Sequence, residues 1–217
     1  MAILNIGPQW FQGYDILFNI VFAIVTLFIA VLSYKAKMVT KEKKYSFFGS
    51  AFLLIAIAHL IFVVFALFRN YVGFLIEPFD FIFLIHILLM LLAYTILLIV
   101  ILKIENKKVT SLIFALILLM VLFSYQYFIK FHIISFVLLV FLTWQFFRNY
   151  QNKRNINTKF VYVSFFLLAC SHIFFAAIQT SVALYVAGEV LQMIGFILLF
   201  FMLMRLVVYN GRKKRKA

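Results

Sequence analysis

Residues 47–62 read FFGSAFLLIAIAHLIF, and a weaker copy of this stretch, FVYVSFFLLACSHIFF, returns 113 residues later at 160–175. Both copies place a histidine, His59 or His172, at the same depth of an apolar segment, and both follow a basic connection. Long apolar segments of this kind are typical of helices that cross a membrane. The stretch therefore predicts an integral membrane protein with an internal repeat. The aligned copies share Phe47/Phe160, Phe52/Phe165, Leu54/Leu167, Ala56/Ala169, His59/His172 and Phe62/Phe175.

The composition of the whole chain also predicts a lipid environment. Hydrophobic residues make up 67% of the 217 residues and charged residues 12%, and the mean hydropathy is +1.15. A soluble domain is about half apolar and about a quarter charged, so this chain carries more apolar surface than a water-soluble fold can bury. The length allows about seven spans of ~20 residues each. We expect a single membrane domain over 1–217, placed in the cell membrane as a multi-pass protein.

The apolar segments divide the chain into an all-α bundle of seven predicted transmembrane helices. Each segment ends in a polar or charged connection, which is where a helix leaves the hydrocarbon layer. The predicted helices cover about 16–34, 47–68, 79–103, 109–128, 133–147 and 160–179, followed by a last helix that ends near 209.

The basic residues fall in alternate connections. Seventeen of the twenty Lys and Arg residues lie after the first, third and fifth predicted helices or in the tail at 210–217. By the positive-inside rule this pattern predicts an outside N-terminus and a cytoplasmic C-terminus. The net charge of +14 is then a topology signal rather than a sign of nucleic-acid binding. The basic cytoplasmic loops can also hold anionic lipid headgroups, at about 1 kcal/mol per basic residue.

The spacing of the repeat predicts how the halves are related. The second predicted helix matches the sixth, four helices later, so both copies have the same orientation in the membrane. This gives a parallel 3+1+3 plan, a known arrangement of membrane proteins. We expect repeat 1 at about 14–104, a linker helix at about 109–128, repeat 2 at about 131–209, and the basic tail at 210–217.

Polar side chains inside the predicted spans mark the candidate site. An ionisable side chain at mid-membrane costs roughly 2–3 kcal/mol or more without a partner, so such residues are functional candidates by default. We predict that these residues gather in the outer half of the bundle. We place His132 elsewhere, as a solvated residue at the headgroup level of the outer interface. The predicted cluster is His59, His86, His172, Gln192 and Glu189, with Asp80 and Glu77 near its mouth.

Three interpretations of this cluster stay open. Hydrogen bonds across helices would give it a structural role, at ~0.6 kcal/mol for each pair. His59 and His172 could instead be the axial ligands of a b-type haem in an electron-transfer subunit, because haem iron accepts imidazole nitrogen. A divalent metal is the third possibility, since imidazole and carboxylate suit zinc or iron. Its ligands would be His59, His86, His172 and Glu189.

Transport is a separate alternative. The 3+1+3 plan resembles that of the SWEET sugar transporters over all seven helices, which implies passage of a small solute between the two halves. The proline–glutamine motif of that family is missing here, since the two prolines, Pro8 and Pro78, lie outside helix interiors. The absence leaves no residue of the transporter motif to carry over.

The helix order provides a second resemblance. A basic loop, the helix with FLLIAIAHLIF at 52–62, a short outer connection and the helix with LIHILLMLLAYTILL at 84–98 follow one another. This order resembles archaeal multi-span membrane proteins built on a three-helix unit and, by topology, the membrane sensor modules of histidine kinases. No arrangement of residues typical of a hydrolase is present. The sequence therefore predicts a non-enzymatic accessory subunit or sensor-like module that works with a membrane protein partner.

Overall fold

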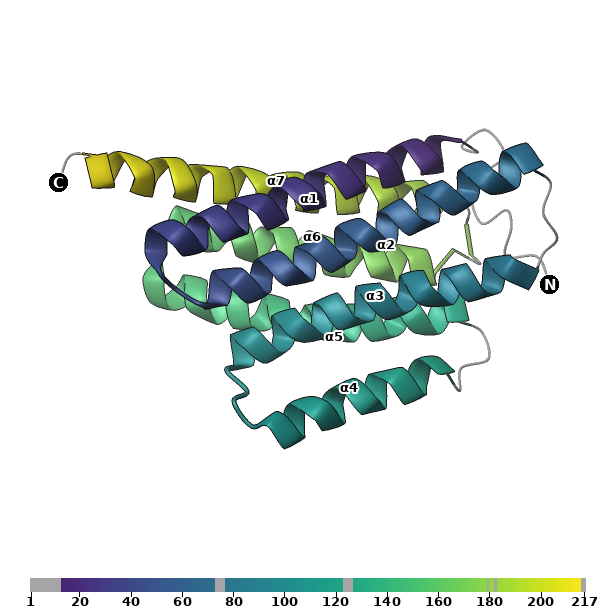
Figure 1. Cartoon of the computed structure of the whole chain (residues 1–217), viewed down its shortest axis with the longest axis horizontal. Helices are drawn as coiled ribbons and strands as arrows, with labels where there is room; N and C mark the ends of the chain where they lie inside the picture. Colours follow the sequence, from purple (N-terminus) through teal and green to yellow (C-terminus); the bar gives the residue numbers. More distant parts are fainter. Residues whose placement is uncertain (1–12, 73–76, 123–126, 179, 182, 216–217) are drawn as a thin grey trace.

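The computed structural model describes residues 13–72, 77–122, 127–178, 180–181 and 183–215, with only the backbone described at 68–72, 77–80, 121–122, 127 and 209–215. The regular structure in these residues is entirely α-helical, as the sequence predicts (Figure 1). The seven helices are α1 (Tyr14–Thr40), α2 (Lys44–Val72), α3 (Glu77–Leu102), α4 (Lys107–Leu122), α5 (Tyr127–Lys153), α6 (Ile156–Ala176) and α7 (Ala183–Arg215).

Six of these helices are long and apolar enough to cross a membrane. The exception is α4, of which the structure describes 16 residues. A span needs about 20 apolar residues at 1.5 Å of rise per residue, which the described part of α4 does not reach. The chain is therefore a polytopic helical membrane protein with seven helices and six candidate spans among the described residues, and residues 123–126 of the span predicted at 109–128 lie outside them.

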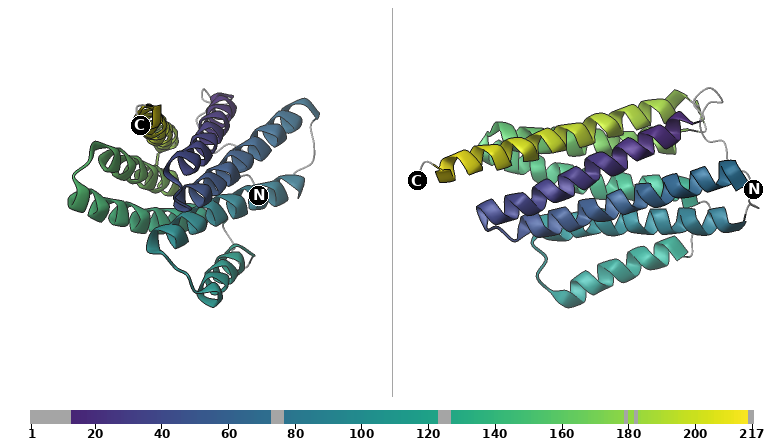
Figure 2. Two further views of the ribbon diagram at one scale, coloured as in Figure 1. Left: turned by 60° about the vertical axis from the view of Figure 1, so that its left-hand side comes forward. Right: turned by 45° about the horizontal axis from the view of Figure 1, so that its top comes forward.

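The six long helices form a closed ring. Each of α1, α2, α3, α5, α6 and α7 packs against its two neighbours in this order, and α7 returns to α1. Helix α4 packs against α3 on the outside of the ring, and Figure 2 shows it standing apart from the other six. Because α4 lies outside the ring, α3 packs directly against α5. We call α1–α3 the first half of the ring and α5–α7 the second half.

Helices α1 and α5 match each other in length and in the way they end. Both have 27 residues, and α5 begins 113 residues after α1, the spacing of the sequence repeat. Left-handed residues follow both helices: Lys41 with φ 59° and Arg154 with φ 43°. Each donates its N–H to the last turn, Lys41 to Lys37 O at 2.8 Å and Arg154 to Tyr150 O at 2.7 Å. A left-handed residue, Lys103 with φ 54°, also follows α3, but its N–H bonds to Val100 O, three residues back rather than four. The feature that α1 and α5 share is therefore the left-handed residue together with the bond four residues back.

Several helices extend beyond their predicted ends. The largest difference at a helix start is at α5, which begins at Tyr127 rather than near 133. The segment YQYFIKFH at 125–132 is predicted as a turn, but its last six residues are helical, because they contain no glycine or proline to break a helix. The lysine-rich end of α1 likewise stays helical to Thr40, because lysine is a good helix former in water as well as near a membrane surface.

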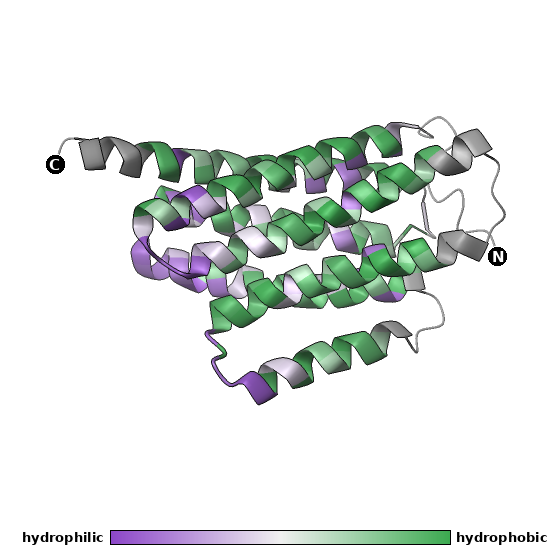
Figure 3. Ribbon diagram, in the orientation of Figure 1, coloured by the Kyte–Doolittle hydropathy of each residue, from purple (hydrophilic) through white to green (hydrophobic). Residues whose placement is uncertain are grey.

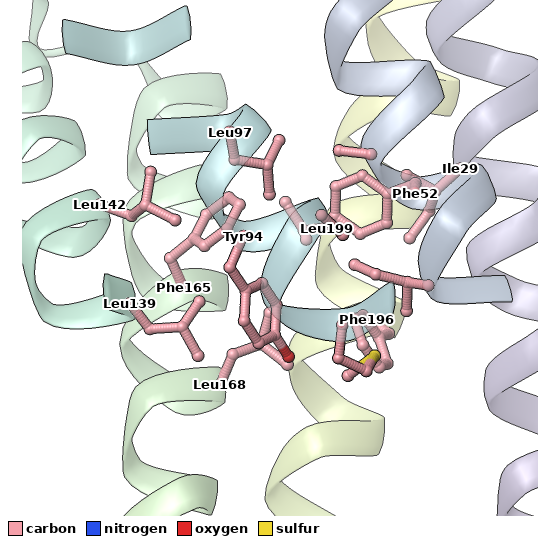
Figure 4. Packing of buried hydrophobic residues seen from close by; sticks show 14 of the residues in the cluster. Ile29, Phe52, Tyr94, Leu97, Leu139, Leu142, Phe165, Leu168, Phe196 and Leu199 are labelled. Carbon is pink, nitrogen blue, oxygen red and sulfur yellow. The ribbon is translucent and has the colours of Figure 1, made fainter. Parts of the chain in front are cut away.

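The core of the ring is apolar and closely packed. Figure 4 shows Tyr94 at its centre, with Leu139 and Leu168 on one side and Phe196 on the other. Small residues bring some helices together, because they allow close backbone approach. A Cβ atom on Gly195 of α7 would lie 3.1 Å from Ser164 O of α6. The large apolar side chains on the outer surface, which would be unfavourable in water, fit contact with lipid tails.

The hydrophilic connections gather at one end of the bundle. The α1–α2, α3–α4 and α5–α6 connections lie at the same end as the C-terminal end of α7 (Figure 1). Coloured by hydropathy in Figure 3, this end is hydrophilic and the helices between the two ends are mostly hydrophobic. A smaller group of hydrophilic positions lies inside the bundle, nearer the opposite end. That inner group contains the candidate site.

Candidate functional site

All four histidines of the chain are buried. His59 is 3% exposed, His86 8%, His132 6% and His172 2%. They come from α2, α3, α5 and α6, so the cluster includes helices of both halves of the ring. The His59 and His86 ring centroids lie 5.6 Å apart, and those of His132 and His172 lie 5.1 Å apart. The Phe131 ring joins the two pairs, at 6.3 Å from His86 and 5.7 Å from His172.

His59 is oriented by an asparagine of the preceding helix. Its Nδ1 lies 2.8 Å from Asn19 Oδ1, so the ring donates from Nδ1 and the amide oxygen accepts. The Asn19 amide group donates to Asp15 O of its own helix, which fixes which way the amide points. His59 Nε2 is buried without a hydrogen-bond partner among the described residues. The Phe22 and Phe196 rings pack on this side chain, with centroids at 5.2 and 6.4 Å.

His172 uses both of its ring nitrogens. Nδ1 lies 2.8 Å from His132 Nδ1, and Nε2 lies 3.2 Å from the Tyr94 hydroxyl. A bond between two imidazole nitrogens needs one donor and one acceptor, so at least one of the rings is neutral. The three side chains form a hydrogen-bonded chain across α3, α6 and α5. Because Tyr94 belongs to the first half and His172 to the second, the chain connects the halves through the apolar core.

His86 is bonded to the backbone of the neighbouring helix. Its Nδ1 lies 3.0 Å from Ala58 O of α2, so the ring donates from Nδ1 to that carbonyl. The ring also stacks nearly parallel to Phe83, at 6.2 Å between centroids and 9° between planes. The carbonyl and the stacked ring together set the orientation of His86 beside His59.

The two hydrogen-bonded histidine pairs occupy matching positions in the sequence. Asn19 and His132 are 113 residues apart, as are His59 and His172. In each pair the partner on α1 or α5 contacts Nδ1 of the histidine on α2 or α6, 40 residues later. The same geometry therefore holds an amide in one half and a second imidazole in the other. Phe196 also lies against His59 as Tyr94 lies against His172, but it lacks a hydroxyl.

Glu189, the described acidic residue of the predicted cluster, has its hydrogen-bond partner on its own helix, α7. Glu189 is buried and hydrogen-bonded to Tyr185, and its Oε2 has no partner among the described residues. The Tyr185 ring packs on Phe175 at 5.5 Å, and Phe175 packs on His132 at 4.9 Å. Phe175 thus separates the histidine pair from Glu189. Gly188 makes room for it, since a Cβ there would lie 2.8 Å from the Phe175 ring.

The structure brings together part of the predicted cluster. His59, His86 and His172 share one group of rings, while Gln192 is buried on α7 with Glu189. The Glu77 and Asp80 side chains lie outside the described residues. The prediction that His132 is solvated at the headgroup level is wrong. Because α5 begins six residues earlier than expected, His132 lies within a helix and faces the core.

Two partners, Asn19 and Tyr94, were missed by the sequence reasoning. The signal for Asn19 was present, because extending the repeat one helix towards the N-terminus aligns it with His132. Tyr94 had no such signal: Val207, which lies 113 residues later, carries no polar group, and aromatic residues are spread over the whole chain. Only the three-dimensional structure, in which the Tyr94 hydroxyl lies 3.2 Å from His172 Nε2, reveals its role.

The geometry does not suit the predicted haem ligands. An axial histidine must offer a ring nitrogen to iron. His59 has an unpartnered Nε2, but both nitrogens of His172 are already engaged. His172 would have to give up a hydrogen bond to bind iron, so the pair does not fit as two axial ligands. Among the residues the structure describes, no group of three His, Cys, Asp or Glu side chains is placed to hold a metal ion.

Comparisons with known proteins place no restriction on the function. No protein family, curated protein or solved structure matches the chain. The resemblances drawn from helix order and from the 3+1+3 plan therefore stay predictions. What the structure establishes is a polytopic helical membrane protein with four buried histidines.

Proposed function

We propose that this chain is a non-enzymatic, sensor-like membrane module built from two parallel halves, with the histidine cluster as the joint between them. The observation that carries the proposal is the hydrogen bond between Tyr94 of one half and His172 of the other, inside an apolar core. Around this bond the four histidines contact one another through rings from both halves. A signal that alters the cluster would alter how the halves pack.

The parallel 3+1+3 plan is supported by matches at several levels. The lengths of α1 and α5, the left-handed residues Lys41 and Arg154, and the two Nδ1 hydrogen bonds all repeat at the 113-residue spacing. The helix contacts follow the same two-fold pattern around the ring. Helix α4 lies outside the ring, as expected of a linker that restores the direction of the chain between two parallel halves.

The orientation follows from the charged end of the bundle. The three basic connections and the end of α7 lie together, which by the positive-inside rule makes this the cytoplasmic side. The N-terminal end of α1 and the histidine cluster are then nearer the outside. The basic face supplies the surface for anionic lipid headgroups or for a membrane protein partner.

Modest energies in the cluster support a switching role over a purely structural one. Hydrogen bonds between membrane helices contribute ~0.6 kcal/mol on average, so the cluster adds little to a core packed as closely as this one. Two conformations of a protein commonly differ in free energy by a few kcal/mol. Forming or breaking a few such hydrogen bonds therefore changes the free energy enough to favour one conformation over the other. The polar chain is thus better placed to select between packings than to hold the fold together.

The proposal is tested by measuring the cytoplasmic ends while changing the cluster. Spin labels are attached at two exposed positions in a Cys170→Ser background: Lys43→Cys in the α1–α2 connection and Lys153→Cys at the end of α5. The distance distribution is measured in lipid nanodiscs at neutral pH. We expect His172→Leu and the milder Tyr94→Phe to change this distribution, because both remove the bond between the halves.

A matched control lies one residue from Tyr94. Thr95 is fully buried on α3, and its hydroxyl donates to Leu91 O of the same helix. Thr95→Val removes a buried hydroxyl without touching the other half, so the distribution should stay as in the wild type. If a folded Tyr94→Phe or His172→Leu variant also keeps the wild-type distribution, the cluster only packs and the sensor-like role is wrong.

A further inference from the structure

The hydrogen positions of the His132–His172 pair follow from its third member. Tyr94 is 1% exposed, and among the described residues the only partner found for its hydroxyl is His172 Nε2. In the neutral pair the hydroxyl therefore donates to Nε2. His172 must then carry its hydrogen on Nδ1 and donate it to Nδ1 of His132. This arrangement leaves every one of these bonds with one donor and one acceptor.

An added proton changes the arrangement in one way only. If the proton stays on His172, the His172 ring donates from both of its nitrogens. If the proton moves to His132, the His132 ring donates to His172 Nδ1, and His172 has its one hydrogen on Nε2. In both cases His172 Nε2 carries a hydrogen, so Tyr94 must accept. The N–H group in the His132–His172 bond and the one in the His172–Tyr94 bond both still have an acceptor. The Tyr94 hydroxyl hydrogen loses the acceptor it had.

The surroundings limit the pair to one proton. Two protons would set two N–H groups against each other across 2.8 Å. From α3 the pair faces Tyr94 and, across Phe131, the imidazole of His86. On the α7 side Phe175 separates it from Tyr185 and the Glu189 that Tyr185 bonds.

We propose that His132 and His172 form a buried binding site for a single proton, whose uptake reverses the hydrogen bond of Tyr94. The proton comes from the aqueous phase and forms one N–H bond; no electron moves and no bond between heavy atoms changes. The reversal changes the joint between α3 and α6, because Tyr94 then accepts from His172 and its own hydroxyl hydrogen has no acceptor among the described residues. The effect of the proton on the halves rests on the proposed function, in which the histidine cluster is the joint between them. The proton is then the signal to which this joint responds.

The first half provides the internal comparison. His59 also has a hydrogen-bonded Nδ1, but its partner is the Asn19 amide and its Nε2 lies among the Phe22 and Phe196 rings. A proton added there would create an N–H group without an acceptor in the described residues. The His132–His172 pair, by contrast, offers an acceptor at each end of His172. Proton uptake should therefore occur at the second half and not at the first.

The experiment is an acid titration of the full chain in lipid nanodiscs, with ¹⁵N-labelled histidine and ¹³C-labelled tyrosine followed by NMR. We expect a coupling between the two Nδ1 nuclei through the hydrogen bond. The His132 and His172 signals should move together in a single one-proton step, with the Tyr94 ring carbon and without His59. Tyr94→Phe should lose this step within the pH range in which the wild type shows it, and Thr95→Val should keep it.

Several results would overturn the inference. Separate steps for the two rings, a Tyr94 signal that does not move with them, or a first step at His59 would each contradict a shared proton site. So would the lack of any uptake by the pair before the protein unfolds. If one of these results is found and Tyr94→Phe still changes the spin-label distances at neutral pH, the proposed sensor-like role is retained. The proton is then excluded as its signal.

Discussion

The two halves of the ring hold their central histidines with the same geometry but different chemistry. In the first half Asn19 bonds His59, and the remaining ring nitrogen faces phenylalanine rings. In the second half His132 bonds His172, and the remaining nitrogen meets Tyr94. A hydrogen-bond partner lies at a matching position in each half, while single residue differences decide whether the histidine is isolated or part of a chain. The difference between the two halves of the cluster therefore depends on two positions, 132 and 94.

The largest expected effect compares the two central histidines directly. His172→Leu leaves both the Tyr94 hydroxyl and a His132 nitrogen without a partner, at about 1–3 kcal/mol for each unsatisfied buried group, partly relieved in a membrane. We expect a loss of about 2–4 kcal/mol in the free energy of unfolding. His59→Leu strands only the Asn19 oxygen and removes an unpartnered nitrogen, so its loss should be about 1 kcal/mol or less.

Thermal or denaturant unfolding of both variants in the same detergent checks this difference. His86→Leu is a useful third variant, because it frees only the Ala58 carbonyl of the neighbouring helix. Equal losses for His59→Leu and His172→Leu would show that the two halves are energetically equivalent. The different hydrogen bonding of His59 and His172 would then make no difference to the free energy of unfolding.

The next effect concerns the aromatic cover over the second pair. A Cβ atom at Gly188 would lie 2.8 Å from the Phe175 ring, which packs on His132. Gly188→Ala should push that ring against the pair and cost about 1–3 kcal/mol, as overpacking does. Gly49→Ala in the first half meets the Tyr34 ring at 3.1 Å and Ala30 O at 3.2 Å, and both contacts are longer than the 2.8 Å at Gly188. It should cost less in the same unfolding assay; a larger loss at Gly49 would contradict the packing account.

Sequence reasoning predicted much of this architecture because the repeat and the charges are one-dimensional signals. Apolar segments gave the helices, and the basic connections all fall at one end of the structure. Helix ends were less predictable, because charged residues such as those around Lys37 stay helical beyond the lipid. The placement of His132 failed for a related reason. Lys130 and the aromatic residues near it suggested an interface, whereas the helix turns His132 inward.

The cluster itself was only partly predictable. Buried polar residues in spans are few, so His59, His86 and His172 could be named from composition and depth. Their partners depend on which helices pack together and on rotation about each axis. Tyr94 becomes a hydrogen-bond partner because its long side chain reaches His172 of α6, a helix that is not a neighbour of α3 in the ring, and no periodicity within α3 contains that information.

A smaller effect is expected from making the second half resemble the first. His132→Asn places at 132 the residue that already bonds a histidine from the equivalent position 19. The amide oxygen should accept from His172 Nδ1, so we expect a loss of about 1 kcal/mol or less in unfolding free energy. His132→Leu, which leaves that N–H unpaired, should cost about 1–3 kcal/mol. Equal costs for the two variants would show that the backbone positions 19 and 132 are not equivalent.

The smallest effect should be a gain, from completing the hydrogen-bonded chain in the first half. Phe196 lies on His59 as Tyr94 lies on His172, with ring centroids at 6.4 and 5.8 Å. Phe196→Tyr would bring a hydroxyl towards His59 Nε2, the buried nitrogen that lacks a partner among the described residues. One new hydrogen bond should raise the unfolding free energy by about 1 kcal/mol or slightly less.

Phe52→Tyr is the matched control, because Phe52 is equally buried and packs on Phe196, so its added hydroxyl should destabilise. If both tyrosines destabilise equally, the two halves do not share the geometry that places Tyr94, and the match between Phe196 and Tyr94 is a coincidence of packing.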